Sequence, residues 1–523
     1  MKPHALCLAA AMVAVLTAAA GLFPPVVRAA ESEDVQKARE TLDLLFAEEL
    51  KRVRDTPDAA DDVELAKRLL ETARKATGEP ALLALLCETA CDLAADSPDG
   101  YGVVSDAVEL GLKHAPEKAD TWSDRLIAVR QNQFKAARGD DKVEAGETLL
   151  DLLIGRAEGR IAALDLSEAS VPYGRAAGAA RVIGSVRVPE IDGRLAWLAH
   201  ATTALAEAKT LEAALAKEPG DEAMRERLVR LYLVDLDRPV EAAAFVEGVQ
   251  DASLAKYVPG AAKGAASAPE LACLELAQWY AGLAEAAPTA AREPLYVRAE
   301  RYLRRFLDMS DAEDLARLKG KALLGRIEAA RDREFPQRWV GLLPRVDPRQ
   351  YALHGQWERR GTALASVRPA GMSEIVIPAI LRGAYDLRVQ FVRTSGTHAV
   401  GIALPTGASQ VYLFLSTGDG AHHGLDLVRG RAVRSNETTV RPGTLENDRP
   451  YDLLVRIRLD DGQAAIRAAL DGKEFIRWRG PQEALSLARW SRFKRKDAPG
   501  LGTIGVTAVF RKVEVRTRSC GPL

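Results

Sequence analysis

The hydrophobic period of this sequence changes near residue 335, and this change constrains the fold more than any other feature. Between residues 34 and 332 apolar side chains recur at helical spacing, which predicts amphipathic helices. From Trp339 onward apolar and polar residues alternate, which predicts half-buried strands. We therefore expect an α and β multidomain protein, with an all-α array of helical hairpins over residues 30–335 and an antiparallel β-sandwich (jelly roll) over residues 340–523.

The composition is that of a folded protein, with 47% apolar and 28% charged residues in a chain of 523. These fractions exclude wholesale disorder, a collagen-like fibre and a polytopic membrane protein. The net charge of −1 hides an asymmetry, because residues 340–523 carry 28 basic and 17 acidic side chains, whereas the preceding residues carry 44 basic and 56 acidic ones. We expect the two halves to attract each other at low ionic strength.

The first 29 residues (1–29) have the pattern of a signal peptide. Lys2 supplies a positive charge, residues 5–27 carry none, and small residues around Ala29 suit a cleavage site. An uncleaved anchor is the alternative, because an uncharged stretch of this length is able to span a bilayer. We expect an exported protein, periplasmic or extracellular, that contacts a membrane only if this segment is retained.

Few cysteines remain after such a cleavage, namely Cys87, Cys91, Cys273 and Cys520. They are too few to build a disulfide scaffold of this size. Cys87 and Cys91 share one face of a predicted helix, where a disulfide between them would strain the helix. We interpret these cysteines as buried structural thiols.

One stretch of the helical half is poor in helix formers. Gly174, Gly178 and Gly184, together with two prolines, weaken any helix over residues 171–189. This stretch is expected to mark a seam between subdomains or an exposed loop.

Two stretches of the helical half resemble tetratricopeptide repeats. The packing positions of the repeat match Leu228, Leu231, Tyr232, Ala242 and Phe245 in the first stretch and Leu276, Trp279, Tyr280, Ala299, Tyr302 and Phe306 in the second. The resemblance implies a stacked helical scaffold with a groove for a protein partner. The alternative is that these aromatic residues only fill the core between helices.

The β half contains hairpin signals and a recognisable order of strands. Asp461-Gly462 and Asp471-Gly472 lie between alternating runs, as two-residue hairpin turns require. The succession of residues 383–393, 394–405, 424–430 and 449–457 resembles a concanavalin-like (laminin-G-like) jelly roll. It is similar to the bacterial domain family called 3-keto-disaccharide hydrolase, in the variant that planctomycete-type bacteria join to exported helical-repeat proteins.

The resemblance implies a fold rather than a reaction. Laminarinase-like relatives carry a Glu-x-Asp-x-x-Glu set along one strand, and this sequence has no such spacing. Glu374 and Asp386 are isolated in sequence, whereas a retaining glycosidase needs two carboxyl groups about 5 to 5.5 Å apart. The G-x-G-x-x-G pattern at residues 500–505 enters a predicted strand rather than a helix, so we interpret it as part of the sandwich. We assign no catalytic residue, cofactor or metal.

Two kinds of side chain in the β half suit a carbohydrate ligand. Flat aromatic rings contact the apolar faces of sugars, and Trp478 and Trp490 lie at a strand end and in the following loop. Core packing is the alternative for both. His422 and His423 suit a polar rim of a ligand site or, with further ligands, a metal ion, unless they only face solvent.

The densest local feature is a basic run that consists of Arg489, Arg492, Lys494, Arg495 and Lys496. Together with the aromatic residues between them, these side chains attract polyanions and offer stacking surface. For an exported protein we expect no nucleic acid, and the counterpart is an acidic polysaccharide, lipid headgroups or the acidic helical half. A merely solvated loop is the alternative.

These features favour an exported, non-catalytic interaction protein. Its helical scaffold would bind a protein partner, and its β-sandwich would bind a glycan or another envelope component. The alternative is an enzyme, a carbohydrate-active hydrolase of the jelly-roll fold similar to glycoside hydrolases.

Overall fold

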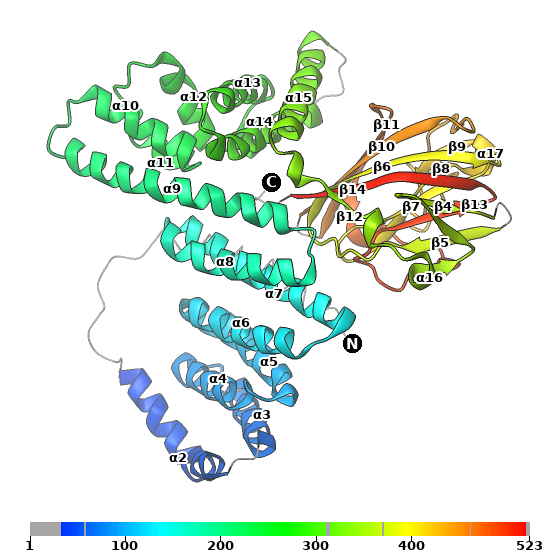
Figure 1. The fold of residues 1–523 in the computed structure, drawn as a ribbon. Helices are drawn as coiled ribbons and strands as arrows, with labels where there is room; N and C mark the ends of the chain where they lie inside the picture. The colour runs from blue at the N-terminus through cyan, green and yellow to red at the C-terminus, as the bar shows by residue number, and fades with distance from the viewer. Residues whose placement is uncertain (1–32, 57–58, 310–313, 369–370, 461, 519–523) are drawn as a thin grey trace. The chain divides into compact units, whose positions relative to one another are not determined.

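The computed structural model describes residues 33–56, 59–309, 314–368, 371–460 and 462–518 (Figure 1). The chain divides between Ser185 and Val186 into two compact units. The predicted signal peptide, residues 1–29, and Cys520 lie outside the described residues. No helix in the described ranges combines the length and the apolar character needed to cross a bilayer.

The first unit is a stack of α-helices in which successive helices pack on one another. Its helices are α2 (Glu33–Asp55), α3 (Ala59–Lys75), α4 (Pro80–Ala94), α5 (Tyr101–His114), α6 (Ala119–Ala136), α7 (Gly139–Ala162) and α8 (Leu166–Ile183). Cys87 and Cys91 on α4 are buried free thiols, as predicted. Burial raises the pKa of each to about 12, so both thiols stay protonated in the folded chain.

The prediction of a weakened helix over residues 171–189 was wrong for most of that stretch, whereas the division between the two units, after Ser185, falls within it. Helix α8 continues through Pro172, Gly174 and Gly178, and the chain leaves it at Gly184, whose backbone is left-handed (φ 61°). The buried face of α8 consists largely of alanines. Such small side chains allow close packing on α7, and this tertiary contact outweighs the low helix propensity of the glycines and the proline.

The second unit begins with helices and continues into the sandwich (Figure 1). Its helices are α9 (Val188–Leu215), α10 (Glu222–Arg230), α11 (Pro239–Ala243), α12 (Ala252–Ala262), α13 (Glu270–Ala286), α14 (Thr289–Met309) and α15 (Leu315–Glu334). Residues 231–235, between α10 and α11, form a π-helical turn. Cys273 on α13 is a third buried free thiol.

The aromatic positions that resemble tetratricopeptide repeats lie between these helices. Tyr232 stacks on Phe245 with ring centroids 6.0 Å apart, and Tyr280 stacks on Tyr302 at 5.8 Å. The three tyrosines are buried, so these rings fill the core between helices. Helices α13 and α14 form a full hairpin, whereas the second helix of the first stretch, α11, spans only five residues.

The sandwich consists of two antiparallel sheets that enclose one core. The eight-stranded sheet has the order β12 (Lys473–Pro481), β11 (Gln463–Leu470), β10 (Pro450–Asp460), β6 (Ala384–Ser395), β14 (Thr507–Arg518), β4 (Ala363–Ser366) and β3 (Trp357–Arg360), with β1 (Val340–Gly341) also paired to β14. The six-stranded sheet has the order β2 (Ala352–His354), β5 (Met372–Val376), β13 (Gly500–Ile504), β7 (Val400–Pro405), β8 (Gln410–Ser416) and β9 (His422–Leu425). Two short helices, α16 (Pro348–Tyr351) and α17 (Thr417–Gly420), lie between strands. The predicted order of helices followed by an antiparallel β-sandwich is confirmed.

Strand alternation divides the side chains between the core and the two outer faces of the sandwich. Leu387 and Phe391 of one sheet and Leu413 of the other point into the shared core. Asp471 (φ 50°) and Gly472 (φ 79°) form the predicted turn between β11 and β12, because both have the left-handed backbone that such a hairpin turn requires. The glycine-rich pattern at residues 500–505 belongs to strand β13, as predicted.

Candidate functional site

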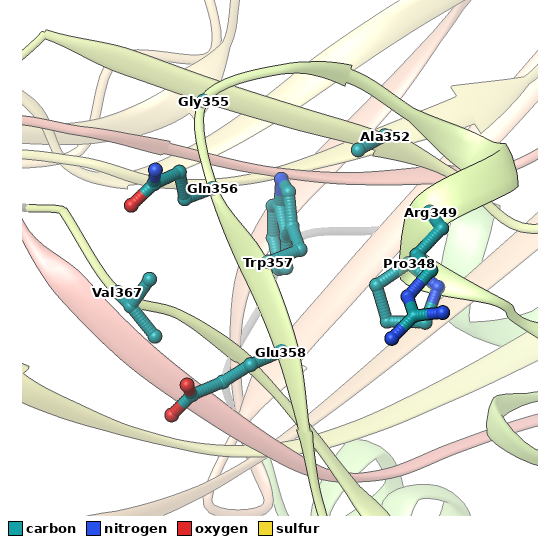
Figure 2. A pocket seen from close by; sticks show the side chains of 8 residues that line it. All are labelled: Pro348, Arg349, Ala352, Gly355, Gln356, Trp357, Glu358 and Val367. Carbon is teal, nitrogen blue, oxygen red and sulfur yellow. The ribbon is translucent and has the colours of Figure 1, made fainter.

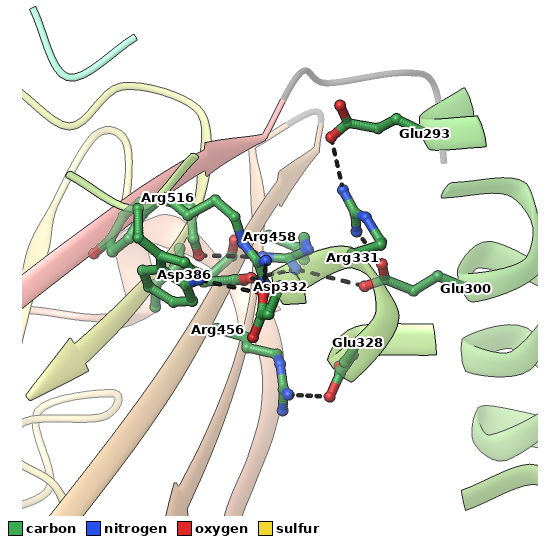
Figure 3. Close-up of polar contacts among 12 residues, drawn as sticks. Glu293, Glu300, Glu328, Arg331, Asp332, Asp386, Arg456, Arg458 and Arg516 are labelled. Atoms are coloured by element: carbon green, nitrogen blue, oxygen red, sulfur yellow. Dashed lines mark hydrogen bonds and ion pairs between the residues drawn. The ribbon is translucent and has the colours of Figure 1, made fainter. Parts of the chain in front are cut away.

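Helix α15 lies against part of the outer face of the eight-stranded sheet, in the same unit (Figure 3). Arg456 on β10 pairs with Glu328 on α15 at 2.5 Å, and Arg516 on β14 pairs with Asp332 on α15. Burial raises the pKa of Glu328, although Arg456 opposes this shift. Acidic side chains of the helix thus meet basic side chains of the sheet.

Asp386 on β6 lies beneath this contact and has no exposed surface. It accepts hydrogen bonds from Arg458 at 2.8 Å and from Arg516 at 2.9 Å (Figure 3). Two guanidinium groups therefore neutralise the one buried carboxylate. The part of this face around Asp386 therefore serves an internal interface.

The outer face of the six-stranded sheet is covered by residues 485–499, a segment between β12 and β13 that we call the strap. Leu487 and Phe493 of the strap pack on Tyr412 and Phe414 of β8. These four side chains belong to a small apolar cluster separate from the main core. The strap thus fills the sheet face with its own side chains.

Glu374 on β5 anchors the strap from below. Its carboxylate has no exposed surface, and its Oε1 accepts a hydrogen bond of 2.7 Å from the hydroxyl of Tyr412. Its Oε2 accepts a hydrogen bond of 3.1 Å from the main-chain N–H of Arg492. Burial and the Glu374 carboxylate raise the pKa of Tyr412 well above its usual range, so the phenol remains a donor. Near the end of the strap, Gln410 Nε2 donates to the carbonyl oxygen of Ala498 at 2.6 Å.

Two glycines make room for the aromatic side chains on this face. A Cβ on Gly500 would overlap the ring of Phe493, and a Cβ on Gly401 would lie 2.6 Å from the ring of Phe414. The glycine-rich start of β13 therefore has a packing role, because it lets an aromatic ring of the strap lie directly on the strand.

Trp490 is the strap residue that presents an aromatic surface to solvent, with 42% of its area exposed. Its ring stacks on Tyr412 with centroids 5.7 Å apart and is tilted against Phe414 at 6.1 Å. Since one face of the indole covers these two rings, the exposed area belongs to the rest of the ring. The structure thus holds a flat apolar platform in a fixed orientation.

The basic side chains of the strap surround this platform in the sequence. Arg495 pairs with Asp497 at 3.1 Å, and Lys496 Nζ donates to the main-chain carbonyl of Ala408 at 3.2 Å. The remaining three are exposed and form no ion pair with any residue in the described ranges, namely Arg489, Arg492 and Lys494. Two of the five basic side chains are therefore bound within the chain, and the other three are free to bind a ligand.

The other predicted ligand residues do not join Trp490. Trp478 is 4% exposed in the main core, and its Nε1 donates to Glu437 at 3.2 Å. His423 is also buried, and its Nδ1 accepts from the main-chain N–H of Ser416 at 3.1 Å. Burial lowers the pKa of His423 to about 4, so the ring is neutral near pH 7. Neither Trp478 nor His423 is placed to contact a ligand from solvent, because hydrophobic burial takes both into the interior.

His422 begins β9, is half-buried and bridges to Thr417 rather than to the strap. Among the described residues, no three His, Cys, Asp or Glu side chains are grouped so that they could hold a metal ion.

A shallow hollow of about 390 Å³ lies at the edge of the sandwich, beside β2 and β3 (Figure 2). It is lined by Pro348, Arg349, Ala352, Gly355, Gln356, Trp357, Glu358 and Val367. Trp357 is only 8% exposed and packs on Phe510 in the core, and Glu358 pairs with Arg360 at 2.6 Å. The aromatic ring of this hollow thus belongs mainly to the core, which makes it a weaker candidate than the strap.

Sequence reasoning missed the residues that hold the platform, namely Glu374, Tyr412 and Phe414. A signal for the two aromatic residues was present, because residues 411–415 are apolar at every position. Such a strand is buried on both faces, so something had to cover its outer side. Glu374 is a single carboxylate in a strand, and no local pattern distinguishes it.

No protein-family model and no curated protein sequence matches this chain. Several solved structures are similar to its C-terminal β part. The carbohydrate binding module CBM66 from Bacillus subtilis is 12% identical, with a TM-score of 0.22, over 34% of this chain and 95% of its own. A peanut lectin is 9% identical, with a TM-score of 0.25, over 34% and 95%. A protein of unknown function with a galectin-like fold from Bacillus subtilis is 10% identical, with a TM-score of 0.23, over 34% and 94%.

Proposed function

We propose that the β-sandwich is a non-catalytic carbohydrate-binding domain whose binding surface is the strap. The observation that carries this proposal is the Trp490 ring, exposed on one side and, on the other, stacked on Tyr412 and tilted against Phe414. Sugar rings present apolar C–H faces that pack on such a flat surface. Because the ring is already immobilised, binding costs little further side-chain entropy.

The segments that pack on the outer faces of the sandwich support the strap as the binding surface. Helix α15 covers part of one outer face, and the strap covers the other. A ligand that approached the six-stranded sheet would therefore meet the strap before the sheet. Its outer side offers an aromatic platform and free hydrogen-bond donors next to each other in the chain, as sugar recognition requires.

The arrangement of carboxylates favours binding over hydrolysis. Glu374 and Asp386 lie on opposite outer faces of two sheets, whose backbones pack about 10 Å apart. Asp426, which follows β9, is separated from the strand of Glu374 by three strands, or about 19 Å between backbones. A retaining glycosidase needs two carboxyl groups about 5 to 5.5 Å apart. From the resemblance to the 3-keto-disaccharide hydrolase family we therefore propose a fold and not an activity.

Export and a protein partner belong to the same proposal. Export rests on the signal-peptide pattern of residues 1–29. A partner for the helices rests on their stacked hairpins and on a hollow of about 570 Å³ in the second unit, lined by residues that include Leu215, Arg225 and Phe245. Amino-terminal sequencing of the protein from its native host tests the first point. Cross-linking from Arg225→Cys in the native host tests the second.

A glycan array with the full chain lacking residues 1–29 tests the carbohydrate proposal, and calorimetry then measures the affinity for the sugars that bind. We expect Trp490→Ala to weaken binding by about tenfold or more, as for an aromatic anchor at the centre of a site. Leu315→Ala, at an exposed apolar residue on α15, serves as the control and should change the affinity by less than about twofold. Absence of glycan binding, or binding that survives Trp490→Ala, contradicts the proposal. Release of reducing sugar from a bound glycan would favour the hydrolase.

A further inference from the structure

Charged side chains on the open parts of the sandwich are often paired with opposite charges. Arg449 lies 2.9 Å from Asp471, and Arg477 lies 2.8 Å from Glu474. On the covered face, acidic residues of the helices and Asp386 neutralise the arginines of the sheet. Acidic residues of the helices therefore offset part of the basic excess of residues 340–523.

The strap concentrates unpaired cations in one short segment. Arg489, Arg492 and Lys494 lie within six consecutive residues, are exposed and have no ionic partner among the described residues. Trp490 lies between the first two of them in the chain. Three like charges held this close repel one another, and their mutual repulsion is relieved when an anion binds.

These three cations are not needed to hold the strap in place. Arg492 contributes its main-chain N–H to Glu374, and its side chain is left to solvent. Phe493 is seated against Gly500, and Gln410 holds the main chain at Ala498. Main-chain and aromatic contacts therefore hold the strap in place. They fix the Cα atoms of the three cations and leave their charged groups free to bind a ligand.

We infer that the ligand of this surface is an acidic polysaccharide, bound by Trp490 through a sugar ring and by Arg489, Arg492 and Lys494 through its carboxylate or sulfate groups. The inference rests on the proposed carbohydrate-binding function and adds the charge of the ligand. A linear acidic polysaccharide carries its charges beside its rings, which matches a platform flanked by cations. Guanidinium groups also bind carboxylate and sulfate oxygens in a bidentate manner.

Two other polyanions fit the observations less well. Single-stranded nucleic acid is bound by several aromatic residues in succession, whereas Trp490 is the one tryptophan of the strap and Phe493 is packed on the sheet. A membrane surface is bound by a helix with a wide apolar face, whereas the strap is an irregular segment whose apolar side chains Leu487 and Phe493 face the sheet. Both polyanions are included in the test as competing outcomes.

Calorimetry of the full chain lacking residues 1–29 tests the inference with matched pairs of polymers. The pairs are polygalacturonate and its methyl ester, and dextran sulfate and dextran. At least one acidic polymer should bind about tenfold more tightly than its neutral partner at low salt, because each exposed ion pair contributes up to about 1 kcal/mol, and three such pairs exceed the 1.4 kcal/mol of a tenfold change. This preference should fall towards unity near 0.5 M salt, where screening shortens to a few Å.

Matched variants assign the effect to the strap. The triple variant Arg489→Ala, Arg492→Ala and Lys494→Ala should lose the preference for the acidic polymer and keep the affinity for the neutral one. The triple variant Lys473→Ala, Arg479→Ala and Arg511→Ala removes the same charge from exposed positions elsewhere and should keep the preference. Trp490→Ala should weaken binding of both polymers.

The outcomes separate the two proposals. If neutral and acidic polymers bind equally and Trp490→Ala weakens both, carbohydrate binding stands and the acidic ligand is overturned. If no polymer binds, both are overturned. Tighter binding of single-stranded DNA, or of vesicles that contain phosphatidylglycerol, than of every acidic polysaccharide also overturns the inference.

Discussion

The main-chain N–H of Arg492 donates a hydrogen bond of 3.1 Å to Oε2 of Glu374, a carboxylate with no exposed surface. One buried side chain on β5 thereby fixes the segment that carries both the aromatic platform and the free cations. The same carboxylate accepts from Tyr412, on which Trp490 stacks. The geometry of the candidate site therefore depends on a residue that no ligand touches.

Glu374→Met tests this dependence. The thioether side chain is of similar length but offers no carboxylate, so the Tyr412 hydroxyl and the Arg492 N–H lose their buried acceptor, and we expect a loss of about 1–3 kcal/mol or more in the free energy of unfolding. Hydrogen exchange should accelerate over residues 489–496. Glu483→Met, at an exposed position next to the strap, is the control and should leave both measurements unchanged. Unchanged exchange in Glu374→Met would show that the strap does not depend on this carboxylate.

Gly500→Ala tests the packing of the strap on the sheet. The added methyl group overlaps the ring of Phe493, which must shift, and overpacking of this kind costs about 1–3 kcal/mol. Chemical denaturation measures the cost. Gly341→Ala, where the new Cβ meets only ordinary contacts, should change stability far less. Equal effects of the two substitutions would mean that Phe493 is not seated against β13.

Asp386→Asn tests the ionic contact beneath helix α15. Removal of this charge leaves Arg458 and Arg516 without their shared buried carboxylate, and breaking a buried pair in this way costs about 3–5 kcal/mol. Asp452→Asn breaks a partly exposed pair with Arg388 on the same sheet and should cost about 1 kcal/mol or less. Thermal and chemical unfolding of both variants checks the contrast, and similar costs would contradict a buried role for Asp386.

His423 predicts a pH dependence of stability. Burial lowers its pKa from 6.5 to about 4, so between these values the unfolded chain binds a proton that the folded chain rejects. The free energy of unfolding therefore rises with pH through this window, and this residue removes up to about 3 kcal/mol as the pH falls from 6.5 to 4. His423→Asn keeps an acceptor for the Ser416 N–H and removes the titration, so its stability should vary less over this range. An unchanged pH profile would contradict the prediction.

The fold class could be predicted from the sequence because local patterns of residues determine it. The change of period near residue 335 separates helices from strands, and the Asp471-Gly472 turn fixes a hairpin. The continuous helix α8 was missed because its packing on α7 outweighs the local preference of its glycines.

The opposite charges of the two halves were visible in the composition. Where the halves meet, however, Arg456 pairs with Glu328 and Arg458 lies near Glu300 in largely buried positions, so we expect a weaker response to salt than the composition alone suggests.

The candidate site could be predicted only in part, for a physical reason. Trp490 and its basic neighbours are adjacent in the chain, so composition reveals them. Their support comes from Glu374 and Tyr412, which are distant in sequence and meet the strap only through the fold. Trp478 was also a candidate for ligand contact, with core packing as the alternative, and its position on β12 directs it into the core. Strand register, which composition does not report, separates the two tryptophans.

Hydroxyl-radical footprinting of the glycan-bound chain tests most directly whether the ligand lies on the strap. With an acidic oligosaccharide that binds, oxidation of Trp490 and of the peptide that spans residues 489–496 should fall by several-fold, since a stacked sugar excludes solvent from the exposed indole. The peptide that contains Trp357 should not change. Protection at the hollow beside β3, with Trp490 oxidised as in the free protein, would contradict the assignment of the binding surface to the strap.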